Sequence, residues 1–126
     1  MRAEPFEIHI PDAALEDMRR RLRGTRWAED FGNRDWGYGV ERGWLEEMVG
    51  YWAESFDWRA QEAGMNRLPH YRVTIDGIPL HFMHLKGSGP APRPLVLTHG
   101  WPWPFWDWQE VACRLADPAA FGGSAE

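Results

Sequence analysis

Apolar residues recur every three or four positions in the first half of the chain, which is the spacing of one face of a helix. One such stripe consists of Leu15, Met18 and Leu22. Asp12 precedes the stripe as a good N-cap residue, and Gly24 follows it as a good C-terminal stop. The pattern therefore predicts a helix between these two residues, after a short extended segment over residues 6–10.

A second stripe predicts another helix, and its members are Leu45, Met48, Val49, Trp52 and Phe56. The residues between the two stripes, 27–39, are rich in glycine, asparagine and aspartate and predict an irregular connection. A weaker helical pattern runs from Trp58 to Ala63 and is closed by Gly64. Pro69 ends this helical half of the chain.

The apolar pattern then changes to a period of two residues, as expected of strands. Its members are Tyr71, Val73 and Ile75, followed by Leu80 and Phe82. Asp76-Gly77 lies between the two runs and is a strong signal for a two-residue turn. The sequence therefore predicts a β-hairpin.

The last apolar run, Leu95–Leu97, has no alternation, which is typical of a strand buried on both faces of a parallel sheet. It leads into His99-Gly100-Trp101-Pro102, so the chain turns at the carboxyl end of the predicted strand, where open α/β sheets bind ligands. Gly100 lets the backbone bend close to a ligand, and Pro102, a candidate cis-proline, fixes the loop. The backbone N–H of Trp101 is then free to point above the sheet. A final helix is predicted over residues 105–115, stopped by Asp117-Pro118.

Composition and charge exclude several classes of function. Hydrophobic residues make up 44% and charged residues 26% of the chain, as in globular domains. The net charge of −5 argues against a nucleic-acid partner, and the arginines within residues 19–23 are expected on a solvated helix face. The nine tryptophans either fill a core or line an aromatic pocket. A single cysteine, Cys113, excludes an intrachain disulfide and favours a reducing compartment.

The start of the chain lacks the apolar core of a signal peptide. No run approaches the roughly 20 apolar residues of a membrane span. We therefore expect a cytoplasmic chain that does not span a membrane, with homo-oligomerisation left open.

The motifs together resemble the N-terminal region of epoxide hydrolases of the microsomal and juvenile-hormone type, which include bacterial members and belong to the α/β-hydrolase superfamily. The matching elements occur in the family's order: Phe6-Glu7-Ile8-His9-Ile10-Pro11, Leu22, Thr25-Arg26-Trp27, Trp36-Gly37-Tyr38-Gly39-Val40, Tyr51-Trp52, Phe56-Asp57-Trp58-Arg59, Asn66, Ile75-Asp76-Gly77, His81-Phe82, and Pro94-Leu95 through Pro102. The sequence departs from the family at Trp103-Pro104, where Gly-Ser is usual. Pro104 still suits the first turn of a helix, whereas Trp103 adds bulk and becomes a candidate pocket-lining residue.

The resemblance implies an α/β fold in which a helical N-terminal meander and a β-hairpin lead into the first strands of an incomplete α/β-hydrolase sheet. Residues 1–110 would form the epoxide hydrolase N-terminal-type region, with the meander over 1–69, the hairpin over 70–86, and the buried strand and His-Gly-Trp-Pro loop over 94–102. Residues 111–126 would begin a truncated α/β-hydrolase core. We expect such a fragment to be inactive by itself.

The mechanism implied by the resemblance opens a small apolar epoxide to a diol through an ester with a nucleophilic aspartate. A histidine with an acidic partner activates the water that cleaves the ester, and two tyrosines polarise the epoxide oxygen. Of these parts, only the backbone N–H of Trp101 can be placed here, as one donor of the oxyanion hole. His99, Gly100 and Pro102 would shape its loop. No nucleophile, cofactor or metal site is expected in this chain.

Two other groups resemble functional motifs without meeting the structural requirements. Asp35-Trp36-Gly37 looks like a nucleophile elbow, but no strand precedes it and it comes before the oxyanion loop. His81 and His84 are three residues apart on a strand and therefore face opposite sides, which disfavours a shared metal ion. His9 and His70 have no evident partners in the sequence.

Two alternative functions remain open from the sequence. One is a different α/β-hydrolase, such as an esterase or a dehalogenase. A downstream serine nucleophile would favour an esterase, whereas an aspartate fits both a dehalogenase and an epoxide hydrolase, which the lid tyrosines would then separate. The other is a non-catalytic, aromatic-rich binding or assembly module that folds by itself. The incomplete sheet predicts instead an exposed apolar edge at residues 95–98, prone to aggregation.

Overall fold

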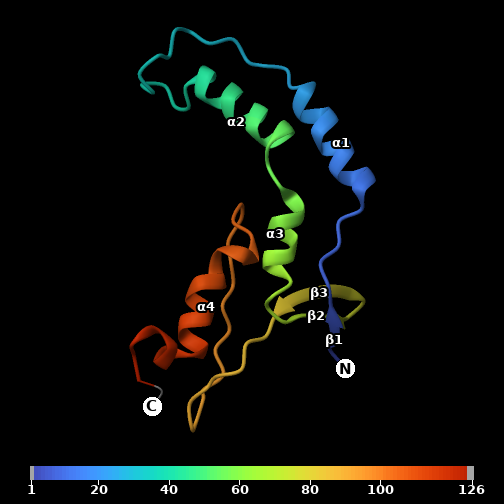
Figure 1. The fold of residues 1–126 in the computed structure, drawn as a ribbon, viewed down its shortest axis with the longest axis vertical. Helices are drawn as coiled ribbons and strands as arrows, with labels where there is room; N and C mark the ends of the chain where they lie inside the picture. The colour runs from blue at the N-terminus through green and yellow to red at the C-terminus, as the bar shows by residue number, and fades with distance from the viewer. Residues whose placement is uncertain (1, 125–126) are drawn as a thin grey trace. The chain divides into compact units, whose positions relative to one another are not determined.

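The computed structural model describes residues 2–124, so the ends of the predicted regions 1–69 and 111–126 lie outside the described residues. Its elements are β1 (Glu4–Phe6), α1 (Asp12–Arg23), α2 (Arg42–Glu54), α3 (Trp58–Met65), β2 (His70–Ile75), β3 (Ile78–Met83), η1 (Phe105–Trp108), α4 (Gln109–Ala116) and η2 (Pro118–Phe121), as Figure 1 shows. The chain divides into two units, residues 9–61 and residues 1–8 with 62–126. No helix within the described residues is long and apolar enough to cross a membrane.

The first predicted helix is confirmed as α1, with one correction at its start. Pro11 occupies the N-cap position, and Asp12 lies in the first turn without capping the helix. The Asp12 carboxylate instead pairs with the Arg59 guanidinium, while its negative charge still suits the positive end of the helix dipole. Gly24 ends the helix as predicted, and its N–H donates to the carbonyls of Arg20 and Arg21.

The second predicted helix is confirmed as α2, although it begins earlier than its apolar stripe. The carboxylate of Glu41 accepts hydrogen bonds from the N–H groups of Gly43 and Trp44 at 2.9 and 2.8 Å, which caps the helix at Arg42. Helix α2 lies beside α1 (Figure 1), and the buried apolar side chains of the two helices are Leu15 on α1 and Ala53 on α2. Most of the apolar stripe itself remains partly exposed.

The irregular connection between α1 and α2 is confirmed, and one buried side chain organises it. The backbone N–H of Asn33 donates to the Asp30 carboxylate at 2.7 Å. The Asn33 side-chain amide donates to the carbonyls of Gly39 and Val40, and its carbonyl accepts from Tyr38 N–H at 3.1 Å. Asn33 thus takes the place of the backbone pairing that the loop lacks.

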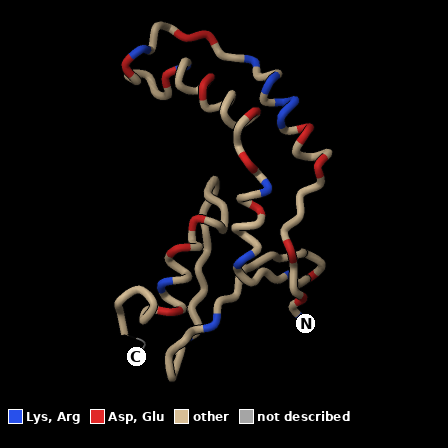
Figure 2. Tube along the Cα trace, viewed as in Figure 1, with Lys and Arg blue, Asp and Glu red and all other residues tan. Residues whose placement is uncertain are grey.

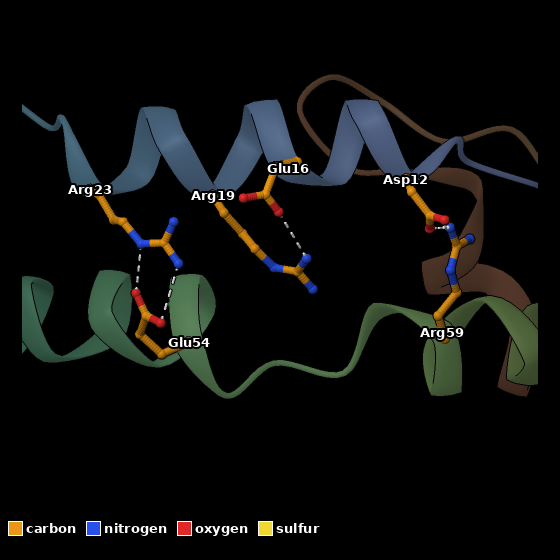
Figure 3. Close-up of polar contacts among 6 residues, drawn as sticks. All are labelled: Asp12, Glu16, Arg19, Arg23, Glu54 and Arg59. Atoms are coloured by element: carbon orange, nitrogen blue, oxygen red, sulfur yellow. Dashed lines mark hydrogen bonds and ion pairs between the residues drawn. The ribbon is translucent and has the colours of Figure 1, made fainter.

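Charged side chains link α1 to its neighbours. The guanidinium of Arg23 makes two hydrogen bonds to the Glu54 carboxylate, at 2.8 and 3.3 Å, and Arg59 reaches Asp12 (Figure 3). The other arginines of α1 pair with Glu16 and Asp17 on the same helix, so the predicted solvated face is confirmed. Figure 2 shows these basic positions beside acidic ones along α1.

We expect the replacement Arg23→Gln to return the pKa of Glu54 toward its ordinary value. Hydrogen bonds and charge from Arg23 lower the pKa of Glu54 below 4.5 in the folded chain. Because this folded pKa is depressed, the stabilisation is present above about pH 4.5 and is lost as the pH falls through the lowered pKa. An NMR titration of the Glu54 side-chain carboxyl carbon measures the change. The variant Arg26→Gln serves as the control, and an unaltered Glu54 titration in Arg23→Gln would contradict the expectation.

The second unit contains the predicted hairpin, extended by one strand. Strands β1, β2 and β3 form an antiparallel sheet in that order, with Phe6 opposite His70 and Ile75 opposite Ile78. Asp76 and Gly77 have φ angles of 51° and 80°, as a type I′ turn requires. Beyond β1, the Asn66 side chain exchanges two hydrogen bonds with the backbone of Ile8, at 2.9 and 2.8 Å.

The apolar face of the sheet is more exposed than the face that carries His70, which is contrary to the usual expectation that the apolar face is buried. Tyr71 stacks on Phe82 on the apolar face, yet Ile78 and Leu80 on that face are 68% and 48% exposed. On the opposite face His70 is only 4% exposed. Burial in this unit is therefore centred on a histidine, Met65 and neighbouring aromatic rings rather than on the aliphatic residues of the hairpin.

The prediction of a buried strand over Leu95–Leu97 is wrong for the described structure. The segment has no strand partner, and Leu95 and Val96 are 64% and 84% exposed. A strand requires a neighbour to accept and donate its backbone hydrogen bonds, and the described sheet consists only of β1, β2 and β3. The segment carries apolar side chains that remain in contact with solvent.

The final predicted helix is confirmed as η1 followed by α4, and it stops at Asp117 before Pro118 as expected. The connection over residues 86–93, which precedes this helix in the sequence, contacts the C-terminal end of α4 through Ser88. Ser88 N–H donates to the carbonyl of Ala116 at 2.8 Å, and Ser88 Oγ donates to the Asp117 carboxylate at 2.9 Å. Residues 86–93 therefore contact the end of α4 directly.

Two glycine substitutions should change stability in opposite directions. Gly77→Ala places a side chain at a φ of 80° and should destabilise the hairpin by about 1–2 kcal/mol. Gly50→Ala lies on α2 with open space beside it and should stabilise the helix by about 0.5–1 kcal/mol. Denaturant unfolding of both variants measures the difference, and equal effects of the same sign would refute this account of the turn.

Candidate functional site

The His-Gly-Trp-Pro loop, residues 99–102, forms a closed turn after segment 94–98, in which Leu97 alone is half-buried. The N–H of Trp103 donates to the carbonyl of Gly100 at 2.8 Å, and the peptide bond between Trp101 and Pro102 is cis. The Trp101 side chain is 95% exposed. Within residues 2–124 no group accepts a hydrogen bond from the Trp101 N–H. The loop thus presents a backbone donor that the described residues do not use.

A pocket of about 230 Å³ adjoins this loop, and its wall consists of His99, Gly100, Trp103, Asp107 and Trp108. A side chain added at Gly100 would meet nothing within 4 Å, so the space beside its backbone is open. Trp103 therefore lies where the sequence predicts a pocket-lining residue. Its contact with a substrate stays a prediction, as do the oxyanion role of Trp101 and the loop-shaping roles of His99, Gly100 and Pro102.

The structure gives Asp35 no features of a nucleophile elbow. Asp35 lies in the exposed connection before α2, without a preceding strand, and its carboxylate accepts the Gly37 N–H at 3.2 Å. Trp36 has a φ of 63° and contacts Trp44, with ring centroids 5.3 Å apart. Among the described residues no group of three or more His, Cys, Asp and Glu side chains could hold a metal ion.

His70 and His81 form a pair that the sequence did not predict, and both contact Phe105, shortly after this loop. The Nδ1 atom of His70 lies 3.1 Å from Nε2 of His81, and Nε2 of His70 lies 2.8 Å from the carbonyl oxygen of Met65. The ring of Phe105, three residues after Pro102, meets both imidazoles edge to face, with centroid distances of 4.7 Å to His81 and 5.8 Å to His70. His84, in contrast, is exposed and lies next to Tyr71, on the other face of the hairpin.

The directions of the two hydrogen bonds follow from the acceptor at one end. Because the Met65 carbonyl can only accept, Nε2 of His70 must carry a hydrogen. In a neutral ring Nδ1 of His70 is then an acceptor, and Nε2 of His81 must donate to it. Both neutral rings are therefore Nε2–H tautomers, and the two nitrogens of buried His70 are both satisfied.

The pairing register of the hairpin, counted outward from its predicted turn, would have placed these two histidines side by side. A two-residue turn at Asp76-Gly77 places Ile75 opposite Ile78, and counting outward places Arg72 opposite His81 and His70 opposite Met83. His70 and His81 are therefore diagonal neighbours on one face. The sequence alone did not show that this face, rather than the apolar one, is buried.

The chain matches the model of the family "Epoxide hydrolase N terminus" over residues 3–108, which is most of its length. The chain belongs to the epoxide hydrolase N-terminus family. This result confirms the resemblance drawn from the motifs, and the match includes the hairpin, the His-Gly-Trp-Pro loop and Phe105.

Individual relatives agree with this membership. The chain is 43% identical to a protein of Stigmatella aurantiaca whose name assigns it to the epoxide hydrolases, and the match covers 97% of this chain and 28% of that protein. It is 32% identical to epoxide hydrolase 1 of Oryctolagus cuniculus, again over 97% of this chain and 28% of the relative. The chain thus spans less than a third of the length of these relatives.

Solved epoxide hydrolase structures share the fold of this family member. The Aspergillus niger enzyme matches with a TM-score of 0.81 and 30% identity over 90% of this chain and 30% of that chain. The juvenile hormone epoxide hydrolase of Bombyx mori matches with a TM-score of 0.75 and 26% identity over 90% of this chain and 31% of that chain. Both matches support the predicted fold class, a helical region and a hairpin associated with an α/β-hydrolase enzyme.

The stability of this epoxide hydrolase N-terminal chain should decrease as the pH falls below about 6.5. Burial lowers the pKa of His81, and electrostatic interactions with the neighbouring His70 and Arg72 lower it further. Because the folded pKa lies below the unfolded value, the unfolded chain binds more protons in the interval between them, and folding is weakened there. Denaturant unfolding at pH 7.5 and at lower pH measures the loss.

The variant His81→Gln keeps an N–H donor but does not titrate, so it should show a smaller decrease with pH. His84→Gln, on the other face of the hairpin, is the matched control and should retain the pH dependence of the parent chain. A larger pH dependence in His81→Gln than in the parent chain would rule out His81 as its source.

Proposed function

We propose that this chain supplies the N-terminal part, and one oxyanion-hole donor, of an enzyme that opens small apolar epoxides to diols. The observation that carries the proposal is the closed turn of the His-Gly-Trp-Pro loop, which leaves the Trp101 N–H without an acceptor among residues 2–124, beside an open pocket. A free backbone donor next to open space is the arrangement that stabilises a developing oxyanion.

The proposed role belongs to the second of two chemical steps. In the first step a carboxylate of the complete enzyme attacks an epoxide carbon, the carbon–oxygen bond breaks, and the released oxygen takes up a proton. In the second step water adds to the resulting ester, and its carbonyl oxygen becomes an anion before the diol leaves and the carboxylate is regenerated. The Trp101 N–H would donate to that oxygen and lower the barrier of the second step alone.

The two tryptophans in the pocket wall favour an apolar substrate. Trp103 and Trp108 share the pocket wall with His99, Gly100 and Asp107, so a substrate there would contact two indole rings and a single carboxylate. We propose that the nucleophile lies outside residues 1–126, because no Gly-x-Asp-x-Gly or Gly-x-Ser-x-Gly motif occurs in them and Asp35 has no elbow. By this proposal the chain alone does not hydrolyse epoxides.

A chimera tests the oxyanion role. Residues 1–126 replace the matching segment of the Stigmatella relative, and single-turnover kinetics with an aromatic epoxide separate ester formation from ester hydrolysis. Trp101→Pro removes the backbone N–H and should slow ester hydrolysis by about 10²–10³-fold, so that the covalent ester accumulates and is seen by mass spectrometry. Ester formation also shows that the variant is folded.

The matched variant Trp101→Ala keeps the backbone N–H and removes only the exposed side chain. Its ester hydrolysis should stay within about tenfold of the parent chimera, since the donor belongs to the backbone. Equal loss in both variants would assign the effect to the indole and reject the oxyanion role. Epoxide hydrolysis by the isolated 126-residue chain would reject the proposal that the nucleophile lies outside these residues.

A further inference from the structure

Within residues 2–124, no strand pairs with the chain before the His-Gly-Trp-Pro loop. Residues 94–98 form no strand within residues 2–124, and both Leu95 and Val96 are exposed. A backbone donor contributes to catalysis only when its direction is held, because an N–H that moves cannot be aimed at a developing charge. Within residues 2–124, the segment after the loop offers side-chain contacts that can position Trp101.

The segment after the loop has few free backbone torsions. Pro102 and Pro104 each have a fixed φ angle, and the hydrogen bond from Trp103 to Gly100 closes the turn between them. Phe105 follows Pro104 immediately and begins η1. Whatever holds Phe105 thus restricts the Trp101 N–H, four residues earlier.

Phe105 is held by two imidazole rings. It meets His81 at 4.7 Å with an interplanar angle of 73° and His70 at 5.8 Å with an angle of 82°. Edge-to-face contacts of this kind are a favoured arrangement of aromatic pairs, and they depend on the orientation of both rings. A rotated imidazole would present a different surface to Phe105.

The imidazoles cannot rotate freely, because hydrogen bonds hold them in one direction. His81 donates to His70, and His70 donates to the carbonyl of Met65 at the end of α3. His70 is 4% exposed, so breaking either bond would leave a buried polar atom without a partner. The chain of contacts runs from the end of α3 through two rings to Phe105.

We propose that His70 and His81 form a positioning pair that sets the direction of the Trp101 N–H through Phe105. Neither histidine touches the substrate in this arrangement. The proposal rests on the proposed oxyanion role of Trp101 for its catalytic consequence. The ring geometry of the pair does not depend on that role and is tested separately.

The ring geometry is tested in the 126-residue chain and in the chimera, each labelled with ¹⁵N-histidine, at pH 8. Long-range ¹H–¹⁵N spectra should show His70 and His81 as Nε2–H tautomers, with a coupling across the hydrogen bond from His81 to His70. His84 should show no such coupling. An Nδ1–H tautomer of His70 or His81 would overturn the proposed pair, whatever the outcome for epoxide hydrolysis.

The positioning role is tested in the chimera by single-turnover kinetics with active sites titrated. Phe105→Leu removes the ring that contacts the imidazoles and should slow ester hydrolysis by about tenfold, with ester formation and KM within about twofold of the parent. His81→Phe keeps an aromatic ring but loses the donor to His70, and should give the same selective loss. The histidine tautomers should survive in Phe105→Leu.

Phe82→Leu is the matched control, because Phe82 stacks on Tyr71 on the other face of the hairpin, with ring centroids 5.7 Å apart. It should leave the ratio of the rate constants of ester formation and ester hydrolysis as in the parent, even where it lowers thermal stability. Equal slowing of both steps in Phe105→Leu, or selective slowing in Phe82→Leu, would overturn the positioning role. If Trp101→Pro leaves ester hydrolysis unaffected while the tautomers are as expected, the oxyanion proposal fails and the hydrogen-bonded pair stands.

Discussion

A buried imidazole with both nitrogens satisfied is the constraint around which residues 62–124 are arranged. An imidazole nitrogen removed from water costs free energy unless it finds a partner, so His70 requires an acceptor on one side and a donor on the other. The carbonyl of Met65 and the ring of His81 provide them. Meeting this requirement joins the end of α3 to β2 and β3, and Phe6 and Phe105 pack around the resulting pair.

The unit of residues 9–61 depends more on polar contacts than on a large apolar core. Its buried apolar side chains within the described residues are Leu15 and Ala53. Asn33 substitutes for missing backbone pairs in the long connection, and Arg23 with Glu54 joins α1 to α2 (Figure 3). Exposed ion pairs contribute little individually, so this unit has a small reserve of stability in its described contacts. Its partly exposed tryptophans and aliphatic residues are consistent with its membership in a family of larger enzymes.

The candidate site combines the His-Gly-Trp-Pro loop with contacts between Phe105 and two histidines that the sequence did not predict. Family membership and the likeness to solved epoxide hydrolases agree with the motif that ends at Pro102. The structure adds a closed turn, a pocket walled by Trp103, and a path of contacts from Phe105 to two histidines. Trp101 and Phe105 thus belong to one short stretch of chain, which also contains Pro102 and Pro104.

Local patterns in the sequence determined the helices, the hairpin and its turn, because helix periodicity, Gly24 and Asp76-Gly77 act through neighbouring residues. The ordered set of motifs that includes His-Gly-Trp-Pro likewise identified the family. Tertiary structure alone decided which face of the hairpin is buried, that the Met65 carbonyl reaches His70, and that Leu95 and Val96 stay exposed. These outcomes depend on which surfaces meet across long sequence separations. An apolar run becomes a strand only where another strand pairs with it, and a histidine becomes a core residue only where two partners reach its ring.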